Sequence, residues 1–300
     1  EAKVEPFLSP SGPQAVKTQD PVSDLNSSPP AVAIVGMAVS FGPGVSLPEF
    51  QDISFNGRSV IGDRPKGRWR GVSDLFELPA DTIPKWGGFM THLKIGINEF
   101  RIPPKEIPDI LPQHLLMLQV AADAMQDAGL SEVIERPNMG AVIGMDFDFE
   151  ATNFHFRWAL PALVRKWQKK HFPKMDEKAV DNWISDLLDT VVPPLTASRT
   201  LGALGGIIAS RIAREFRFGS ASFGVSAGAA SGNRALEIGI RALQQLESDA
   251  VLVGAVDLNG DLRQILTGTE NGSFSKEGTV HPFGRDHTGT LPGEGAVALI

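Results

Sequence analysis

Three short apolar runs, each meeting a glycine, constrain the fold more than any other feature of the sequence. They are residues 31–36, 139–144 and 250–256. A continuous apolar run of this length is typical of a strand that is buried on both faces of a sheet. Between the runs, residues 112–129 and 234–246 have the apolar spacing of amphipathic helices. This alternation predicts an α/β fold with a mostly parallel sheet that helices cover on both sides.

Composition narrows the class of protein. The chain has 300 residues, of which 42% are hydrophobic and 21% are charged, which is ordinary for a globular protein. Its net charge of −7 argues against a nucleic-acid partner, because phosphate neutralisation needs clustered Lys and Arg. No apolar run is long enough to span a membrane, and no signal peptide is recognisable, so we expect no membrane partner.

The sequence contains no cysteine. This excludes disulfides, thiolate metal ligands and a cysteine nucleophile in one step. It fits a reducing compartment, and we expect a cytoplasmic protein.

Two features indicate how the chain is divided. Residues 1–30 are rich in proline and serine, which predicts an interdomain linker, and residues 31–300 form one domain. The sequence starts in this linker and stops within the strand-like segment 295–300. We therefore expect a piece of a longer polypeptide, truncated before the C-terminal half of its domain.

A segment over residues 151–195 interrupts the strand–helix alternation. Residues 154–160 and 183–188 have amphipathic helical spacing, and the basic run 165–171 lies between them. Such a run is either a solvated helix face or a docking patch for an acidic partner, and both interpretations stay open.

The most informative segment is a strand followed by a tight turn and a helix. Residues 222–226 are strand-like, residues 227–232 are nearly all small, and the helix at Arg234 follows. Such an elbow exposes one side chain at the positive end of a helix dipole. Backbone N–H groups stabilise anions at that position, so we expect the functional site there.

One hypothesis for this elbow is a serine hydrolase or acyltransferase. Residues 224–228 match G-x-S-x-G with Ser226 as nucleophile. Asp257 and either His281 or His287 follow in the Ser, Asp, His order of α/β-hydrolases. The alternative is that Ser226 is only a small residue packed in a turn.

A second hypothesis comes from resemblance. Six segments, in this order, resemble β-ketoacyl synthases of the modular polyketide type: residues 31–44, 111–129, 205–214, 242–257, 274–278 with 282–286, and 292–295. The resemblance implies a thiolase-like fold with α/β/α/β/α layers. It implies that this chain holds the N-terminal half of that fold with its dimer-interface elements.

The elbow departs from this family at the nucleophile. The family's Thr-Ala-Cys-Ser-Ser-Ser falls on residues 227–232, which places Ala229 at the cysteine position. A methyl group cannot attack a thioester, so no acyl-enzyme can form there. The resemblance therefore implies no catalytic residue here, only a vestigial position, Ala229, within an elbow of Ser226, Gly228, Ser231 and Gly232. Whether the domain is itself an enzyme stays open, although it belongs with an acyltransferase complex.

This departure resembles chain length factors, in particular the ketosynthase-like domains of polyunsaturated fatty acid synthases and related iterative polyketide synthases. Residues 234–237, Arg-Ala-Leu-Glu, fit that group. The resemblance implies pairing with an active ketosynthase through the strand and helix beside the elbow. The pair would elongate acyl chains by decarboxylative Claisen condensation.

The resemblance also implies how substrates are handled. Acyl groups would arrive on the phosphopantetheine of an acyl carrier protein, with no cofactor or metal bound directly by this chain. Candidates for the wall of the acyl tunnel or for the interface are Phe147, Phe149 and Phe154. The alternative for these aromatic residues is plain core packing.

Overall fold

The computed structural model describes residues 29–69, 82–96, 99–146, 153–191, 194–258, 261–272 and 274–300. The chain divides into two compact units, Glu1–Ala31 and Val32–Ile300. All the elements named below belong to the second unit.

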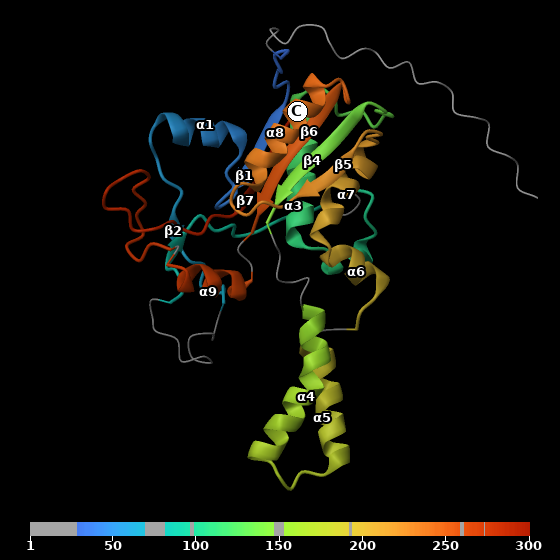
Figure 1. Cartoon of the computed structure of the whole chain (residues 1–300), viewed down its shortest axis with the longest axis vertical. Coiled ribbons are helices and arrows are strands. Elements are labelled where there is room, and N and C mark those ends of the chain that lie inside the picture. Colours follow the sequence, from blue (N-terminus) through green and yellow to red (C-terminus); the bar gives the residue numbers. More distant parts are fainter. Residues whose placement is uncertain are drawn as a thin grey trace, which may run out of the picture. The chain divides into compact units, whose positions relative to one another are not determined.

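A five-stranded mixed sheet forms the centre of this unit (Figure 1). Its strands, in spatial order, are β1 (Met37–Phe41), β7 (Gly295–Leu299), β6 (Ala250–Asp257), β4 (Met139–Met145) and β5 (Ser222–Val225). The strands β5, β4 and β6 are parallel, whereas β7 runs antiparallel to both of its neighbours. The expectation of a mostly parallel sheet is corrected here. Asp257, which ends β6, pairs with Gly295, which begins β7, so the chain re-enters the sheet at the end where it left.

Two of the three apolar runs form the strands that the sequence predicts, since β4 and β6 coincide with them to within a residue. The first prediction is wrong, because β1 begins only at Met37. Ile34 and Val35 are instead 55% and 59% exposed. Beyond the β1–β7 register, which runs to Met37–Leu299, the N–H groups of Val35 and Gly36 still donate to the carbonyl of Ile300.

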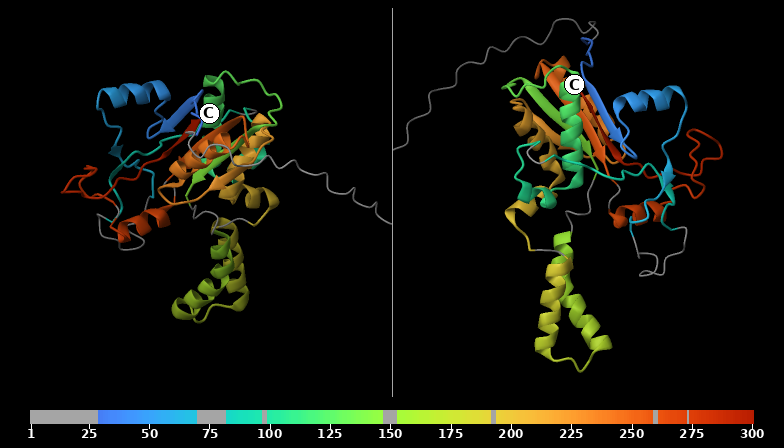
Figure 2. Two further views of the ribbon diagram at one scale, coloured as in Figure 1. Left: turned by 45° about the horizontal axis from the view of Figure 1, so that its top comes forward. Right: turned by 180° about the vertical axis from the view of Figure 1, so that it is seen from behind.

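Helices cover both faces of the sheet. On one face, α3 (Pro112–Asp127) and α7 (Ile208–Phe216) pack against Ala141 and Leu252. On the other, α8 (Ser231–Gln244) packs against the next residues along these strands, Val142 and Val251. Successive residues of a strand point to opposite faces, so a sheet that helices cover on both faces needs apolar residues at every position. In Figure 1 α8 lies in front of the sheet, and the rear view of Figure 2 shows α3 on the opposite face.

The predicted helical segments are confirmed with shifted bounds. The segment 112–129 forms α3, which has Pro112 at its first turn and ends at Asp127, shortly before Gly129. The segment 234–246 forms α8, which begins three residues earlier than the sequence indicates. The described layers, helix–sheet–helix, are three of the five that the resemblance implies.

The segment that interrupts the alternation forms a helical hairpin. Its helices are α4 (Asn153–His171) and α5 (Glu177–Val191), which extend the two predicted pieces by several turns. They share a small core of their own: Leu160, Val164, Val180 and Ile184.

The remaining described elements are short: α1 (Leu47–Phe55), β2 (Gly62–Asp63), β3 (Trp86–Gly87), η1 (Pro104–Asp109), α6 (Ala197–Ala203), η3 (Gly205–Ile207) and α9 (Leu262–Glu270). Among the described helices, none combines the length and apolarity needed to cross a membrane.

Candidate functional site

The predicted elbow is present between β5 and α8. Val225 ends the strand, Ser231 begins the helix, and Gly228 adopts a left-handed conformation (φ 57°) that L-residues with a side chain rarely take. The hydroxyl of Ser231, 6% exposed, accepts from the Ala227 N–H at 2.9 Å and donates to the Gly228 carbonyl at 2.7 Å. Ser231 therefore closes the turn, and its oxygen is already engaged on both sides.

The end of β4 lies directly beneath this turn. A Cβ atom at Gly144 would come within 2.6 Å of the carbonyl group of Ser231 and 2.7 Å of the Gly232 nitrogen. Real Cβ atoms are not found so close to backbone. A glycine at the end of β4 is thus what lets the start of α8 sit against the sheet, and it fixes where the elbow residues point.

A cavity of about 630 Å³ opens beside the elbow. Gly228, Ala229, Ser231 and Gly232 form one wall of it. The ends of β1, β4, β6 and β7 contribute most of the others, with side chains such as Val39, Phe41, Ala255 and Val297. Most of these lining groups are apolar or glycine backbone, so the cavity suits a hydrocarbon chain.

Ala229 stands on this cavity wall and is exposed. The structure thus places Ala229, the predicted vestigial position, on the wall of a largely apolar cavity. A methyl group there offers no lone pair, and the nearby Ser231 hydroxyl is committed to the turn. The arrangement can hold an apolar chain, but it supplies no nucleophile at position 229.

Three carboxylates also border the cavity: Asp146, Asp257 and Glu294. Burial of its carboxyl group raises the pKa of Asp257 to about 6, and the nearby negative charges of Asp146 and Glu294 act in the same direction. A hydrogen bond with the Gln264 side chain opposes the rise. Asp257 still keeps more than a third of its surface open, so solvent moderates the consequences.

Glu294 is buried and fully paired. Its two carboxylate oxygens accept from the guanidinium of Arg68 at 2.7 and 2.9 Å, and one of them also accepts from the Met90 N–H at 2.7 Å. A bidentate pair of this kind is geometrically specific. It ties the residue just before β7 to residues 68 and 90 and thereby fixes one side of the cavity. Sequence reasoning missed this pair, because its members are 226 positions apart.

The serine-hydrolase triad is not assembled among the described residues. Ser226 is exposed and is absent from the described lining of the cavity. His281 and His287 lie exposed in the loop before β7, and in the described part of the chain neither bonds to Ser226 or to Asp257. A serine nucleophile needs a histidine within hydrogen-bond reach that an acid orients. The geometry gives this hypothesis no support.

The structure leaves the tunnel candidates untested. Phe147 and Phe149 lie outside the described residues, and Phe154 belongs to α4 but its side chain is not among those described. Beside the elbow residues, the cavity wall that the structure shows includes Val39 and Phe41, which the sequence did not single out. Val39 and Phe41 are alternate residues of β1, so they share one face of that strand. The sequence pattern shows this sharing, but it does not show which other strands lie beside that face. Among the described residues, no group of three or more His, Asp or Glu side chains could hold a metal ion.

Comparison with known proteins agrees with this geometry. The model of the family "Beta-ketoacyl synthase, N-terminal domain" matches residues 30–300. Polyketide synthase PksM of Bacillus subtilis is 26% identical over 95% of this chain, which spans 6% of that protein. A polyunsaturated fatty acid synthase polypeptide of a Thraustochytrium species is 24% identical over 90% of this chain, which spans 13% of it.

A solved structure extends the comparison to three dimensions. The structure named "PfaC Keto synthase-Chain length factor" is 26% identical, with a TM-score of 0.75 over 89% of this chain and 28% of its own. The family match covers nearly the whole chain, and the fold agrees with it, whereas the relatives named here give the serine-hydrolase hypothesis no support. The chain therefore belongs to the β-ketoacyl synthase family, whose N-terminal domain it contains, with the thiolase-like fold of that family.

Proposed function

We propose that this domain is the non-catalytic, ketosynthase-like partner, or chain length factor, of an active β-ketoacyl synthase. The observation that carries the proposal is Ala229, a methyl group on the cavity wall where the family's motif has its cysteine. A domain that keeps the acyl-sized cavity but lacks the nucleophile can shape a tunnel without forming an acyl-enzyme. The likeness to the PfaC structure, whose name includes a chain length factor, supports the assignment.

The partner and the substrate follow from this role. An active ketosynthase would pair with this domain, and acyl groups would reach the pair on the phosphopantetheine of an acyl carrier protein. The strand β5 supports such pairing, because it is the edge of the sheet and, among the described strands, only β4 pairs with it. An unpaired edge can receive another strand.

The proposed role is a limit on chain length. Each buried methylene gains roughly 0.8 kcal/mol until the growing chain meets a wall. We keep Phe147 and Phe149 as proposed wall residues. Replacing either by alanine should lengthen the products of the reconstituted pair, and an unchanged product profile with an intact pair would remove them from the proposal.

The experiment that tests the proposal is mass spectrometry of the purified chain after exposure to a fatty acyl-CoA. We expect no acyl adduct in the peptide that spans residues 222–236. When a cysteine-bearing ketosynthase is added, the acyl group should appear on its cysteine, and condensation should require both proteins. A stable adduct on this chain alone would contradict the proposal, and labelling of Ser226 by a fluorophosphonate would favour a hydrolase instead.

A further inference from the structure

The helix α4 has an unusual charge for this chain. Among its 19 residues are five cationic side chains and no Asp or Glu, although the whole chain carries a net charge of −7. The five are Arg157, Arg165, Lys166, Lys169 and Lys170. Ion pairs with α5 account for two of these five positive charges, and the other three need another explanation.

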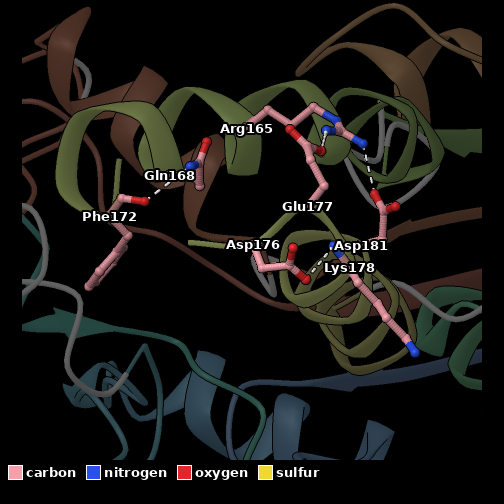
Figure 3. A network of polar contacts seen from close by, with 7 residues as sticks. All are labelled: Arg165, Gln168, Phe172, Asp176, Glu177, Lys178 and Asp181. Atoms are coloured by element: carbon pink, nitrogen blue, oxygen red, sulfur yellow. Dashed lines mark hydrogen bonds and ion pairs between the residues drawn. The ribbon is translucent and has the colours of Figure 1, made fainter. Parts of the chain in front are cut away.

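The two arginines of α4 are neutralised within the hairpin. Arg165 binds Glu177 at 2.9 Å and Asp181 at 2.8 Å, both from the first turns of α5, and Figure 3 shows its guanidinium between the two carboxylates. Arg157 binds Asp189, near the other end of α5, at 3.3 Å. These arginines therefore fasten the two helices together and are not available to an external partner.

The three lysines are arranged differently. Lys166, Lys169 and Lys170 have the spacing i, i+3, i+4, so they share one face of α4, and all three are exposed. That face lies opposite Leu160 and Val164, which are buried against α5. In the described part of the chain, no residue forms an ion pair or hydrogen bond with their ammonium groups.

Apolar groups continue this lysine face toward the start of the helix. Ala162 and Ala159, about one and two turns before Lys166, are exposed, and Trp158 beside them is 68% exposed. Small side chains let another helix approach closely, while an exposed tryptophan beside unpaired cations is typical of a binding surface. We call Trp158, Ala159, Ala162, Lys166, Lys169 and Lys170 the α4 face.

We propose that the α4 face is a docking surface for an acidic helix of another protein. The lysines would meet carboxylates, the alanines would admit the backbone of the partner helix, and Trp158 would pack at its other end. A lipid surface fits less well, because a helix that lies in a membrane inserts its apolar face, and that of α4 is already buried on α5. A nucleic acid fits less well, because the arginines that would grip phosphates are bound to carboxylates.

The test uses the full chain and two fluorescent helical peptides of identical length. One peptide carries three glutamates at i, i+3 and i+4 next to an Ala/Leu stripe, and the other carries glutamine at those positions. By fluorescence anisotropy at low salt, the glutamate peptide should bind about tenfold more tightly, since three modest ion pairs together give roughly that factor. The triple variant K166E/K169E/K170E should lose this advantage and should bind a lysine version of the peptide instead.

A matched control variant distinguishes the effect of the α4 face from the effect of a change in the net charge of the chain. The variant K85E/K94E/K105E makes the same charge change at exposed lysines outside the hairpin, and it should leave peptide binding within about twofold of the original. Circular dichroism of each variant checks that the helices persist. Equal weakening by both triple variants would overturn the proposal. So would binding of phosphatidylserine vesicles or polyuridylate through these lysines with no binding of the glutamate peptide.

Discussion

At the scale of single residues, the proposed role depends on Ala229, whose methyl group lies on the wall of a largely apolar cavity. Ala229 faces a cavity that suits a hydrocarbon chain, but it cannot form a thioester. The residues around it keep the geometry of an elbow: Gly228 supplies the left-handed turn and Ser231 closes it. The elbow therefore has a defined turn and carries a methyl group, which is no nucleophile, at position 229.

The turn depends on Ser231, so Ser231→Ala should destabilise the protein. The substitution removes the acceptor of the Ala227 N–H and the donor to the Gly228 carbonyl, and we expect the free energy of unfolding to fall by about 1 kcal/mol or more. Urea denaturation measures the change. Ser226→Ala, at an exposed position of the same elbow, serves as control and should change stability by less than about 0.5 kcal/mol. Equal effects would show that Ser231 does not hold the turn.

Asp257 should make the free energy of unfolding fall as the pH rises from 4 to 7. Its pKa is raised by burial to about 6, above the value of about 4 in an unfolded chain. The neutral form is thus favoured in the folded state, so its contribution is present below pH 4 and is lost as the pH rises through 6. We expect Asp257→Asn to remove this decline and to raise stability at pH 7 relative to the original chain.

The measurement is the free energy of unfolding of both proteins from pH 4 to pH 7. Because Asp257 is partly open to solvent, only the direction is predicted. Asp186→Asn, an exposed substitution on α5, is the control and should leave the decline in place. A decline of the same size in Asp257→Asn would assign the effect to other groups.

At the scale of elements, the hairpin of α4 and α5 is held by its own core and its own ion pairs. Leu160 and Val164 of α4 pack on Val180 and Ile184 of α5, and the arginines of α4 bind carboxylates of α5. This core is separate from the one around the sheet. The hairpin should therefore open as a local unit.

Leu160→Ala tests that independence. Truncating this buried side chain should cost the hairpin about 2–5 kcal/mol. In hydrogen exchange followed by mass spectrometry, amides of α4 and α5 should lose protection while those of α3 and β4 keep it. Leu201→Ala, at an exposed position of α6, is the matched control and should change neither set. Loss of protection in β4 as well would mean that hairpin and sheet unfold together.

At the scale of the whole molecule, the sheet leaves β5 as its edge, next to the elbow. Phe223 on this strand is 41% exposed, so an apolar side chain lies open at the unpaired edge. The proposed pairing with a ketosynthase would cover it. The α4 face of the hairpin is a second proposed surface, and the two proposals concern different partners.

Phe223→Lys should therefore prevent the proposed pairing without unfolding the domain. A charge on an edge strand disfavours strand addition, and we expect co-purification with a cysteine-bearing ketosynthase to fall about tenfold. Phe172→Lys introduces the same charge on the hairpin, where Phe172 is 52% exposed, and should leave co-purification intact. If both variants pair as well as the original chain, β5 is not the interface.

The sequence by itself determined the strands β4 and β6, the helices α3 and α8, and the elbow between β5 and α8. Each of these depends on local patterns: apolar runs of strand length, helical spacing, and small residues between a strand and a helix. These patterns can be recognised along the chain without knowing which segments meet in space. The family resemblance added the fold.

Only the tertiary structure decided what depends on pairing between distant segments. The pairing of β7 with β1 and the Arg68–Glu294 pair both join residues more than 200 positions apart. The cavity beside Ala229 exists because the ends of four strands meet the elbow, and the raised pKa of Asp257 follows from that crowding. The periodicity of apolar residues shows which face of a helix or strand is apolar, but it does not show which other element will cover that face.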